Sequence, residues 1–352
     1  MKNKAQNTLR ETIAQEFVKA LNENQLPWHS MWISQRAYNA TNGTIYRGVN
    51  ALWLAFNAEL KGYSDPRWCT FKQAVDNGWN VRKGEKGTQV EFWSVYDTKT
   101  RETVSFNEMD RIISLNPDRK DDMRILSKHY TVFNAAQIDG IPEHAAINTD
   151  IDIASIRAQR DTLLQNMGLT FKEGGNAAFY RPSDDSLTMP LDSAFKDDYS
   201  YMSVLLHECG HATGHESRFN RDLSGRFGSE SYAKEELRAE IASAFTSQAL
   251  GFKANDEEKD AALENHKAYI QSWAKAITDA PNELFAAIKD AEKISDYLLE
   301  KGEFERIQKA REPLASEAKQ HESVEALLKD ATVRAEKQDK FKKYIEDNLL
   351  ER

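Results

Sequence analysis

Residues 201–212, YMSVLLHECGHA, hold the most informative pattern in the chain. Apolar residues precede His207, Glu208 and His211, and the stretch predicts a helix with one buried side. On such a helix positions i and i+4 share a face, so His207 and His211 can hold one metal ion while Glu208 points toward its bound water. We predict a divalent-metal centre here, with Glu208 as the catalytic acid and base.

A hydrolytic zinc site needs a third protein ligand and an open position for water. The metzincin pattern would place a third histidine where this chain has Ser217, so that pattern fails. His215 cannot substitute, because at 1.5 Å per residue it would lie about 12 Å along the helix from His207.

The gluzincin pattern, in which a glutamate on a following helix completes the site, fits residues 232–245, YAKEELRAEIASAF. Glu236 and Glu240 lie one turn apart on the same face of this predicted helix. We assign Glu236 as the third ligand and Glu240 as an outer acceptor that orients a histidine. Glu235 lies about 100° round the helix, and we expect it to face solvent.

Two imidazoles and one carboxylate favour Zn2+, with Mn2+ or another divalent metal as the alternative. Cys209 lies on a different face from the histidines, and we interpret it as a small buried residue. Three tyrosines, Tyr199, Tyr201 and Tyr232, could donate a hydrogen bond to a developing oxyanion, and the sequence does not choose among them.

The second half of the chain is predicted to be mainly helical, with a short sheet. We expect helices over 153–167, 199–213, 232–250, 260–279 and 282–300, and strands near 169–172, 177–180 and 187–189. Residues 301–352 contain 24 charged residues of both signs and are expected to form a charged helical tail.

The first half is predicted to be α+β. Helices are expected over 7–22, 49–60 and 70–77, and strands over 88–96 and 130–133 in one small sheet, separated by a long polar insertion over 97–128. A polar stretch near 140–150 is the candidate linker. The expected domains are therefore 1–145 and 150–300, followed by the tail 301–352.

Charge and aromatic residues are unevenly distributed. Residues 1–100 carry 13 Lys and Arg against 9 Asp and Glu, a net of +4, whereas residues 151–352 carry 28 against 38, a net of −10. Six of the seven tryptophans also lie in the first hundred residues. Aromatic rings beside cations are typical of proteins that bind single-stranded nucleic acid, since bases stack on the rings and cations follow the backbone.

The composition bounds the class of protein. With 352 residues, 40% hydrophobic and 29% charged, the chain has enough apolar material for two globular domains. It shows no apolar run long enough to span a membrane and no signal-peptide pattern at its start. Only Cys69 and Cys209 occur, so we expect a reducing, cytoplasmic location and no membrane partner.

Five separated motifs occur in an order that resembles the ArdC-type antirestriction proteins of plasmids and phages. They are TNGTIYRGVNALWL, DPRWCTFKQAVDNGWNVRKGEKG, VFNAAQIDGIP, HECGHATGHESRFNRD and YAKEELRAE, and the resemblance covers about residues 8–300. It implies an N-terminal domain that binds single-stranded DNA, joined to a zincin-like metallopeptidase domain. It also implies His207, His211 and Glu236 as ligands, Glu208 as the acid and base, and six motif positions in the DNA-binding half: Tyr46, Arg47, Asn50, Trp68, Lys83 and Lys86.

Three functions fit these features. The leading hypothesis is an antirestriction protein of a mobile element that binds single-stranded DNA and protects incoming DNA from host restriction. The second is a DNA-stimulated zinc protease whose targets are restriction enzymes or other DNA-bound proteins. The third is a DNA-shielding protein with a catalytically idle metal site. A structural site has no need of Glu208, which counts against the third.

Overall fold

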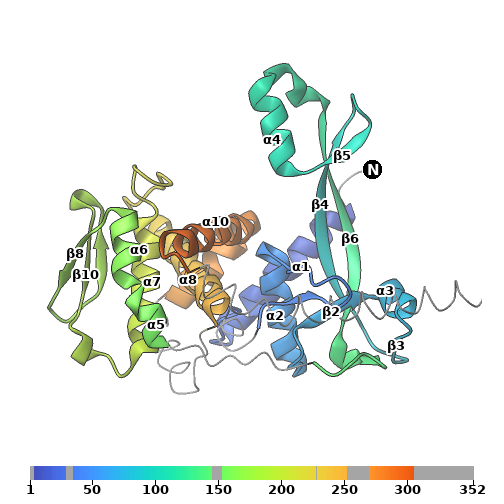
Figure 1. The fold of residues 1–352 in the computed structure, drawn as a ribbon, viewed down its shortest axis with the longest axis horizontal. Helices are drawn as coiled ribbons and strands as arrows, with labels where there is room; N and C mark the ends of the chain where they lie inside the picture. Colours follow the sequence, from blue (N-terminus) through green and yellow to red (C-terminus); the bar gives the residue numbers. More distant parts are fainter. Residues whose placement is uncertain (1–3, 29–34, 145–152, 227, 252–268, 305–352) are drawn as a thin grey trace, which may run out of the picture. The chain divides into compact units, whose positions relative to one another are not determined.

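A five-stranded sheet in the order β1-β2-β6-β4-β5 organises the first half of the chain. The computed structural model describes residues 4–28, 35–144, 153–226, 228–251 and 269–304, and their elements appear in Figure 1. The strands are β1 (Tyr38–Asn39), β2 (Arg67–Thr70), β4 (Thr88–Asp97), β5 (Glu102–Val104) and β6 (Met123–Asn134). Within this sheet, as far as the structure describes it, β1 and β2 are the only parallel pair. A separate ribbon joins β3 (Asn80–Val81) to β7 (Ile138–Asp139).

Two predicted strands are confirmed as neighbours in this sheet, because β4 pairs antiparallel with β6 along its whole length. The prediction for 97–128 was wrong in part. These residues contain β5, the helix α4 (Phe106–Leu115) and the start of β6, which begins at Met123 rather than near residue 130. The outer part of β6 lacks a buried apolar face, so its sequence shows no alternation of apolar and polar residues.

The three helices predicted for the first half are present. They are α1 (Lys4–Asn22), α2 (Gly48–Lys61) and α3 (Phe71–Asp76). Gly62 ends α2 in the left-handed conformation at φ 69°, and Thr70 starts α3 with a capping box to Gln73. The α2 side chain Leu54 packs with Trp68, Val90 and Val132 in the core under the sheet.

The second half is mainly helical, as predicted, with a three-stranded sheet in the order β8-β10-β9. The elements are α5 (Ile153–Ala158), α6 (Arg160–Met167), β8 (Thr170–Glu173), β9 (Phe179–Arg181), β10 (Ser186–Met189), α7 (Asp198–Ala212), α8 (Glu230–Leu250) and α10 (Pro281–Lys301). Residues 269–279 are also helical. The predicted helical stretch 260–268 and the tail 305–352 lie outside the described residues, and the linker 140–150 is described only to residue 144.

Helix α8 is buried along most of its length because α7 and α10 both pack against it. A Cβ atom at Gly210 of α7 would lie 3.4 Å from the Cα of Ala239 in α8. The missing side chain therefore lets the two helix backbones approach closely. This contact brings the two motifs identified in the sequence onto facing surfaces.

Helix α10 also packs against α1 and α2 of the first half. Arg36 bonds to Glu292 at 2.5 Å, and the backbone N–H of Gly48 donates to the same carboxylate at 2.8 Å. Both halves therefore belong to one compact unit, which includes all the described residues. Among the described helices, none is long and apolar enough to cross a membrane.

Candidate metal centre

The two histidines of the motif lie one turn apart on α7. Asp197 caps this helix by accepting the N–H of Ser200, and the apolar residues before His207 are buried. His207 Nε2 and His211 Nε2 are 3.1 Å apart, so both rings point to the same place. The local sequence thus forms a helix whose polar end carries two converging imidazoles.

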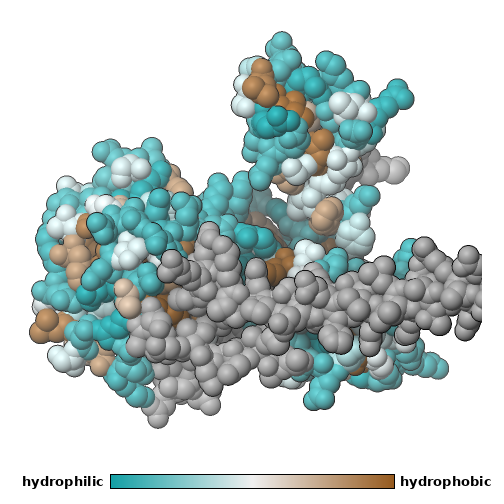
Figure 2. Space-filling view, in the orientation of Figure 1, coloured by the Kyte–Doolittle hydropathy of each residue, from teal (hydrophilic) through white to brown (hydrophobic). Residues whose placement is uncertain are grey.

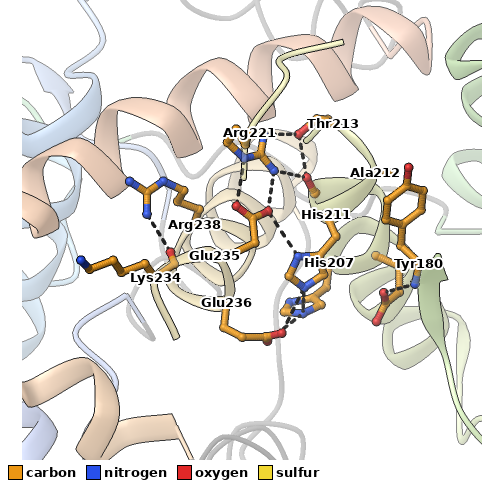
Figure 3. Close-up of polar contacts among 12 residues, drawn as sticks. Tyr180, His207, His211, Ala212, Thr213, Arg221, Lys234, Glu235, Glu236 and Arg238 are labelled. Carbon is orange, nitrogen blue, oxygen red and sulfur yellow. Dashed lines mark hydrogen bonds and ion pairs between the residues drawn. The ribbon is translucent and has the colours of Figure 1, made fainter. Parts of the chain in front are cut away.

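Glu236 of α8 faces these imidazoles, as Figure 3 shows. Its two carboxylate oxygens lie 3.5 Å from His207 Nε2 and 3.4 Å from His211 Nε2. Tetrahedral coordination with metal–ligand distances of about 2.1 Å places ligand atoms about 3.4 Å from one another. The spacing of the three side chains therefore fits a single divalent cation bound between them.

Two further carboxylates contact the outer nitrogens of the rings. Glu240 lies 3.3 Å from Nδ1 of His207, and Glu235 lies 3.4 Å from Nδ1 of His211. Such partners fix the tautomer and orientation of a ligating imidazole. Glu240 therefore lies in contact with His207, the histidine that we propose it orients.

The prediction that Glu235 faces solvent was wrong. Only 8% of Glu235 is exposed, and Arg221 binds its carboxylate through two nitrogens at 2.6 and 3.0 Å. Arg221 lies in the segment that follows α7 and folds back toward α8. The sequence of α8 alone does not indicate that Arg221 lies nearby. Helix geometry by itself therefore predicted a solvent-exposed Glu235, which the structure contradicts.

The carboxylates control the protonation of the histidines in the metal-free protein. Burial alone would lower the pKa of His207, but hydrogen bonds to Glu236 and Glu240 outweigh it and raise the pKa well above its ordinary value. Burial likewise opposes protonation of His211, yet Glu235 and Glu236 raise its pKa to about 9. Burial disfavours the charged form of Glu236, but both histidines lower its pKa overall.

Glu208 lines a cavity of about 350 Å³ beside the two histidines and Glu236. The backbone N–H of Tyr180 in β9 donates to Glu208 Oε2 at 2.8 Å. Of the three predicted tyrosines only Tyr232 lines this cavity, whereas the hydroxyl of the buried Tyr201 accepts a hydrogen bond from Arg160. Sequence reasoning missed Tyr180 and Tyr269, which also line the cavity and come from segments without a recognisable motif.

Two other residues behave as expected. Cys209 is fully buried, and burial raises the pKa of its thiol. His215 lies away from the metal-binding atoms, with its Nδ1 2.8 Å from the hydroxyl of Ser217.

The six residues predicted to bind DNA do not share one surface. Trp68 is a core residue with 1% exposure, and Tyr46 packs half-buried against the same core. Asn50 is engaged with the backbone of Glu91, donating to its carbonyl at 2.6 Å and accepting its N–H at 3.0 Å. Arg47 forms ion pairs with Glu292 and Asp296 of α10, while Lys83 and Lys86 are exposed in the loop before β4.

Trp28, from the first half of the chain, extends to the metal centre. Its fully buried indole packs edge-on against Trp273, with ring centroids 5.3 Å apart. Its Nε1–H donates to Glu240 at 3.4 Å. Because Glu240 also contacts His207, a residue of the first half supports a carboxylate beside a candidate ligand.

Comparison with known protein families assigns a family to each half of the chain. Residues 7–133 match the family described as the N-terminal domain of anti-restriction factor ArdC, and residues 158–290 match the family described as zincin-like metallopeptidase. The chain thus joins an ArdC N-terminal domain to a zincin-like domain.

Relatives with both parts are known in sequence and structure. A DNA primase TraC of Escherichia coli is 39% identical over 300 residues, which are 82% of this chain and 20% of the primase. The corresponding share of a second TraC primase is 27%, so the chain spans between a fifth and little more than a quarter of these relatives. An uncharacterised protein of Sinorhizobium fredii (strain NBRC 101917 / NGR234) is 34% identical over 295 residues, 82% of this chain and 90% of that protein.

The crystal structure of the antirestriction ArdC protein from plasmid R388 in its Mn(II)-bound form superposes with a TM-score of 0.63 at 31% identity. The match covers 83% of this chain and 97% of that one, and the metal-free form gives a TM-score of 0.62. The chain belongs to the ArdC family. Its metal centre takes a divalent ion, zinc or manganese.

We expect metal binding to release protons at pH 7 and to tighten as the pH rises toward 9. The pKa of His211, about 9, keeps this ring protonated in the metal-free protein, whereas only the neutral imidazole binds metal. Protonation of His211 also stabilises the folded, metal-free protein. Its contribution to the free energy of unfolding is complete below pH 6.5 and is lost as the pH rises through about 9. Calorimetric titration with Zn2+ in buffers of different ionisation enthalpy counts the released protons. A count of zero at pH 7 would contradict the expectation.

Replacing Trp28 by Phe should weaken metal binding about tenfold, the lower end of the usual effect of an outer partner. The substitution keeps an aromatic ring against Trp273, and it removes the N–H that Glu240 accepts together with part of the ring volume. Trp53→Phe is the matched control, because the buried Nε1 of Trp53 has no hydrogen-bond partner among the described residues. Competition with a chromophoric chelator measures both affinities. Equal losses in the two variants would refute a specific role for Trp28.

Proposed function

We propose that this protein is an antirestriction factor of a mobile element, one that binds single-stranded DNA and acts through a metallopeptidase site. The main support is the convergence of His207, His211 and Glu236 beside Glu208 in an open cavity. The relationship to the antirestriction ArdC protein of plasmid R388 supports the biological role. Host restriction enzymes and other DNA-bound proteins are the proposed targets.

In this proposal His207, His211 and Glu236 are the metal ligands and Glu240 orients His207. A zinc or manganese ion held there would lower the pKa of a water molecule and polarise a peptide carbonyl. Glu208 is fixed by the N–H of Tyr180 on one oxygen, which leaves Oε1 to take the proton of the attacking water and deliver it to the leaving amine.

Tyr232 is the proposed donor to the oxygen that becomes negatively charged. Burial, followed by the neighbouring Tyr269 and Glu236, raises the pKa of its hydroxyl. The group therefore keeps its proton at neutral pH and can donate a hydrogen bond. Its position in the wall of the cavity supports this role over those of Tyr199 and Tyr201.

The ligand assignment predicts a graded series. His207→Ala, His211→Ala and Glu236→Ala should each lose most of the bound metal, whereas Glu240→Ala should weaken binding by about 10- to 100-fold. Metal analysis of the purified variants, after dialysis against a weak chelator, checks the series. If Glu240→Ala loses the metal and Glu236→Ala keeps it, the two glutamates have been assigned in the wrong order.

Glu208→Gln should keep the metal and the affinity for single-stranded DNA but abolish protection of incoming DNA, since a lost general base costs about 10²- to 10⁴-fold in rate. The assay is the transfer of unmodified plasmid DNA into a restricting host that makes the wild-type or variant protein. Glu216→Gln is the matched control, because Glu216 is exposed and follows the motif by a few residues. Full protection by Glu208→Gln would leave DNA shielding as the function.

A further inference from the structure

One face of the β4–β6 ribbon is open. Side chains of directly paired residues in an antiparallel ribbon lie on the same face, and this face alternates with the other along each strand. Phe92 is paired with Lys128, and the next row toward the core pairs Val90 with Tyr130. Phe92 is 55% exposed and Tyr130 is 43% exposed, which are high values for aromatic side chains within a sheet.

The opposite face holds the acidic residues of the ribbon and is covered along part of its length. Arg10 of α1 bonds to Glu91 at 2.7 Å and lies over the ring of Trp93, 5.2 Å from its centroid. Asp97, the other carboxylate of β4, is buried against Arg119. Ile125 is exposed on that face, but the Glu91 and Asp97 carboxylates lie there as well, so a polyanionic ligand would favour the face that carries Phe92.

The open face combines aromatic rings with positive charge. Its three outer rows contain no Asp or Glu: Phe92–Lys128, Ser94–Leu126 and Tyr96–Arg124. The row at the edge of the core pairs the buried Val90 with the exposed Tyr130 and also contains no acidic residue. The rings of Phe92 and Tyr130 lie 6.3 Å apart at an angle of 74°. Lys128 is exposed and has no carboxylate partner among the residues that the structure describes. Figure 2 shows further apolar surface, in brown, where α4 adjoins the outer ends of these strands.

We infer that single-stranded DNA binds along this open face, with bases stacked on Phe92 and Tyr130 and phosphates contacting Lys128 and Arg124. The inference rests on the proposed DNA-binding function and names its surface. Exposed rings beside unpaired cations match a polyanion whose bases are free to stack. Three of the tryptophans that suggested DNA binding, Trp28, Trp53 and Trp68, are buried and cannot offer a ring face to a base.

The test measures binding of a fluorescein-labelled oligothymidylate to the full-length protein by anisotropy. Phe92→Ala and Tyr130→Ala should each raise the Kd by about fivefold to a hundredfold, the usual effect of losing one stacking ring. Phe92→Tyr and Tyr130→Phe should retain wild-type affinity, because both keep an aromatic ring. Lys128→Ala should reduce the slope of log K against log salt concentration by about 0.7, the value for one contact to a single strand.

Phe71→Ala is the matched control. Phe71 is 56% exposed, like Phe92, but it begins α3 and lies outside the β4–β6 ribbon. Its replacement should leave the Kd unchanged, and circular dichroism should show that all variants are folded. A loss of affinity in Phe71→Ala as large as in Phe92→Ala would overturn the assignment of this face.

The remaining outcomes separate this inference from the function on which it rests. If the wild type does not bind the oligonucleotide even at low salt, the proposed DNA binding fails and the surface assignment fails with it. If the wild type binds and the double variant Phe92→Ala/Tyr130→Ala binds equally well, only the surface assignment fails. If the double variant changes the oligomeric state instead of the Kd, the face is a contact between copies of the protein.

Discussion

The close contact of α7 with α8 is the constraint on which the rest of this structure depends. Gly210 has no side chain at the point where the α7 backbone meets Ala239 of α8. The neighbouring residues of α7 therefore face those of α8 at close range. On α7 these residues include the imidazoles, and on α8 they include the carboxylates. A Cβ atom at position 210 would already be in van der Waals contact with Ala239, so a side chain longer than that of alanine would push the helices apart. The ligand distances, which are now close to what one small cation requires, would then lengthen.

The same contact concentrates negative charge. Glu208, Glu235, Glu236 and Glu240 all lie around the two imidazoles, and among the described residues Arg221 is the cation paired with this group. Buried carboxylates are costly unless a positive charge compensates them. In the metal-free protein protonated histidines supply that charge, which explains why their pKa values rise despite burial. A divalent ion supplies it instead in the metal-bound protein, so proton loss and metal binding are coupled.

Local patterns in the sequence predicted the parts of the site that lie on single helices. The spacing of His207 and His211, and of Glu236 and Glu240, is set by the helical repeat alone, and the structure brings all four together. The sequence pattern could not predict the environment of Glu235, because that environment depends on Arg221, which lies in a loop that folds back toward α8. It could not predict the contact of Trp28 with Glu240 either, since 212 positions separate the two residues.

The first half shows a related limit of composition. Tryptophans beside cations are typical of single-strand binders, yet the same rings are the largest apolar groups available to fill a core. Here Trp68 fills the core under the sheet, and Trp28 packs against Trp273 at the metal centre. Composition counts rings without regard to burial, whereas binding requires exposed ones. Phe92 and Tyr130 form an exposed pair of rings on a two-stranded ribbon that extends beyond the core, where few side chains remain to cover them. The surface that we propose for single-stranded DNA therefore lies at the part of the sheet that is least needed for packing.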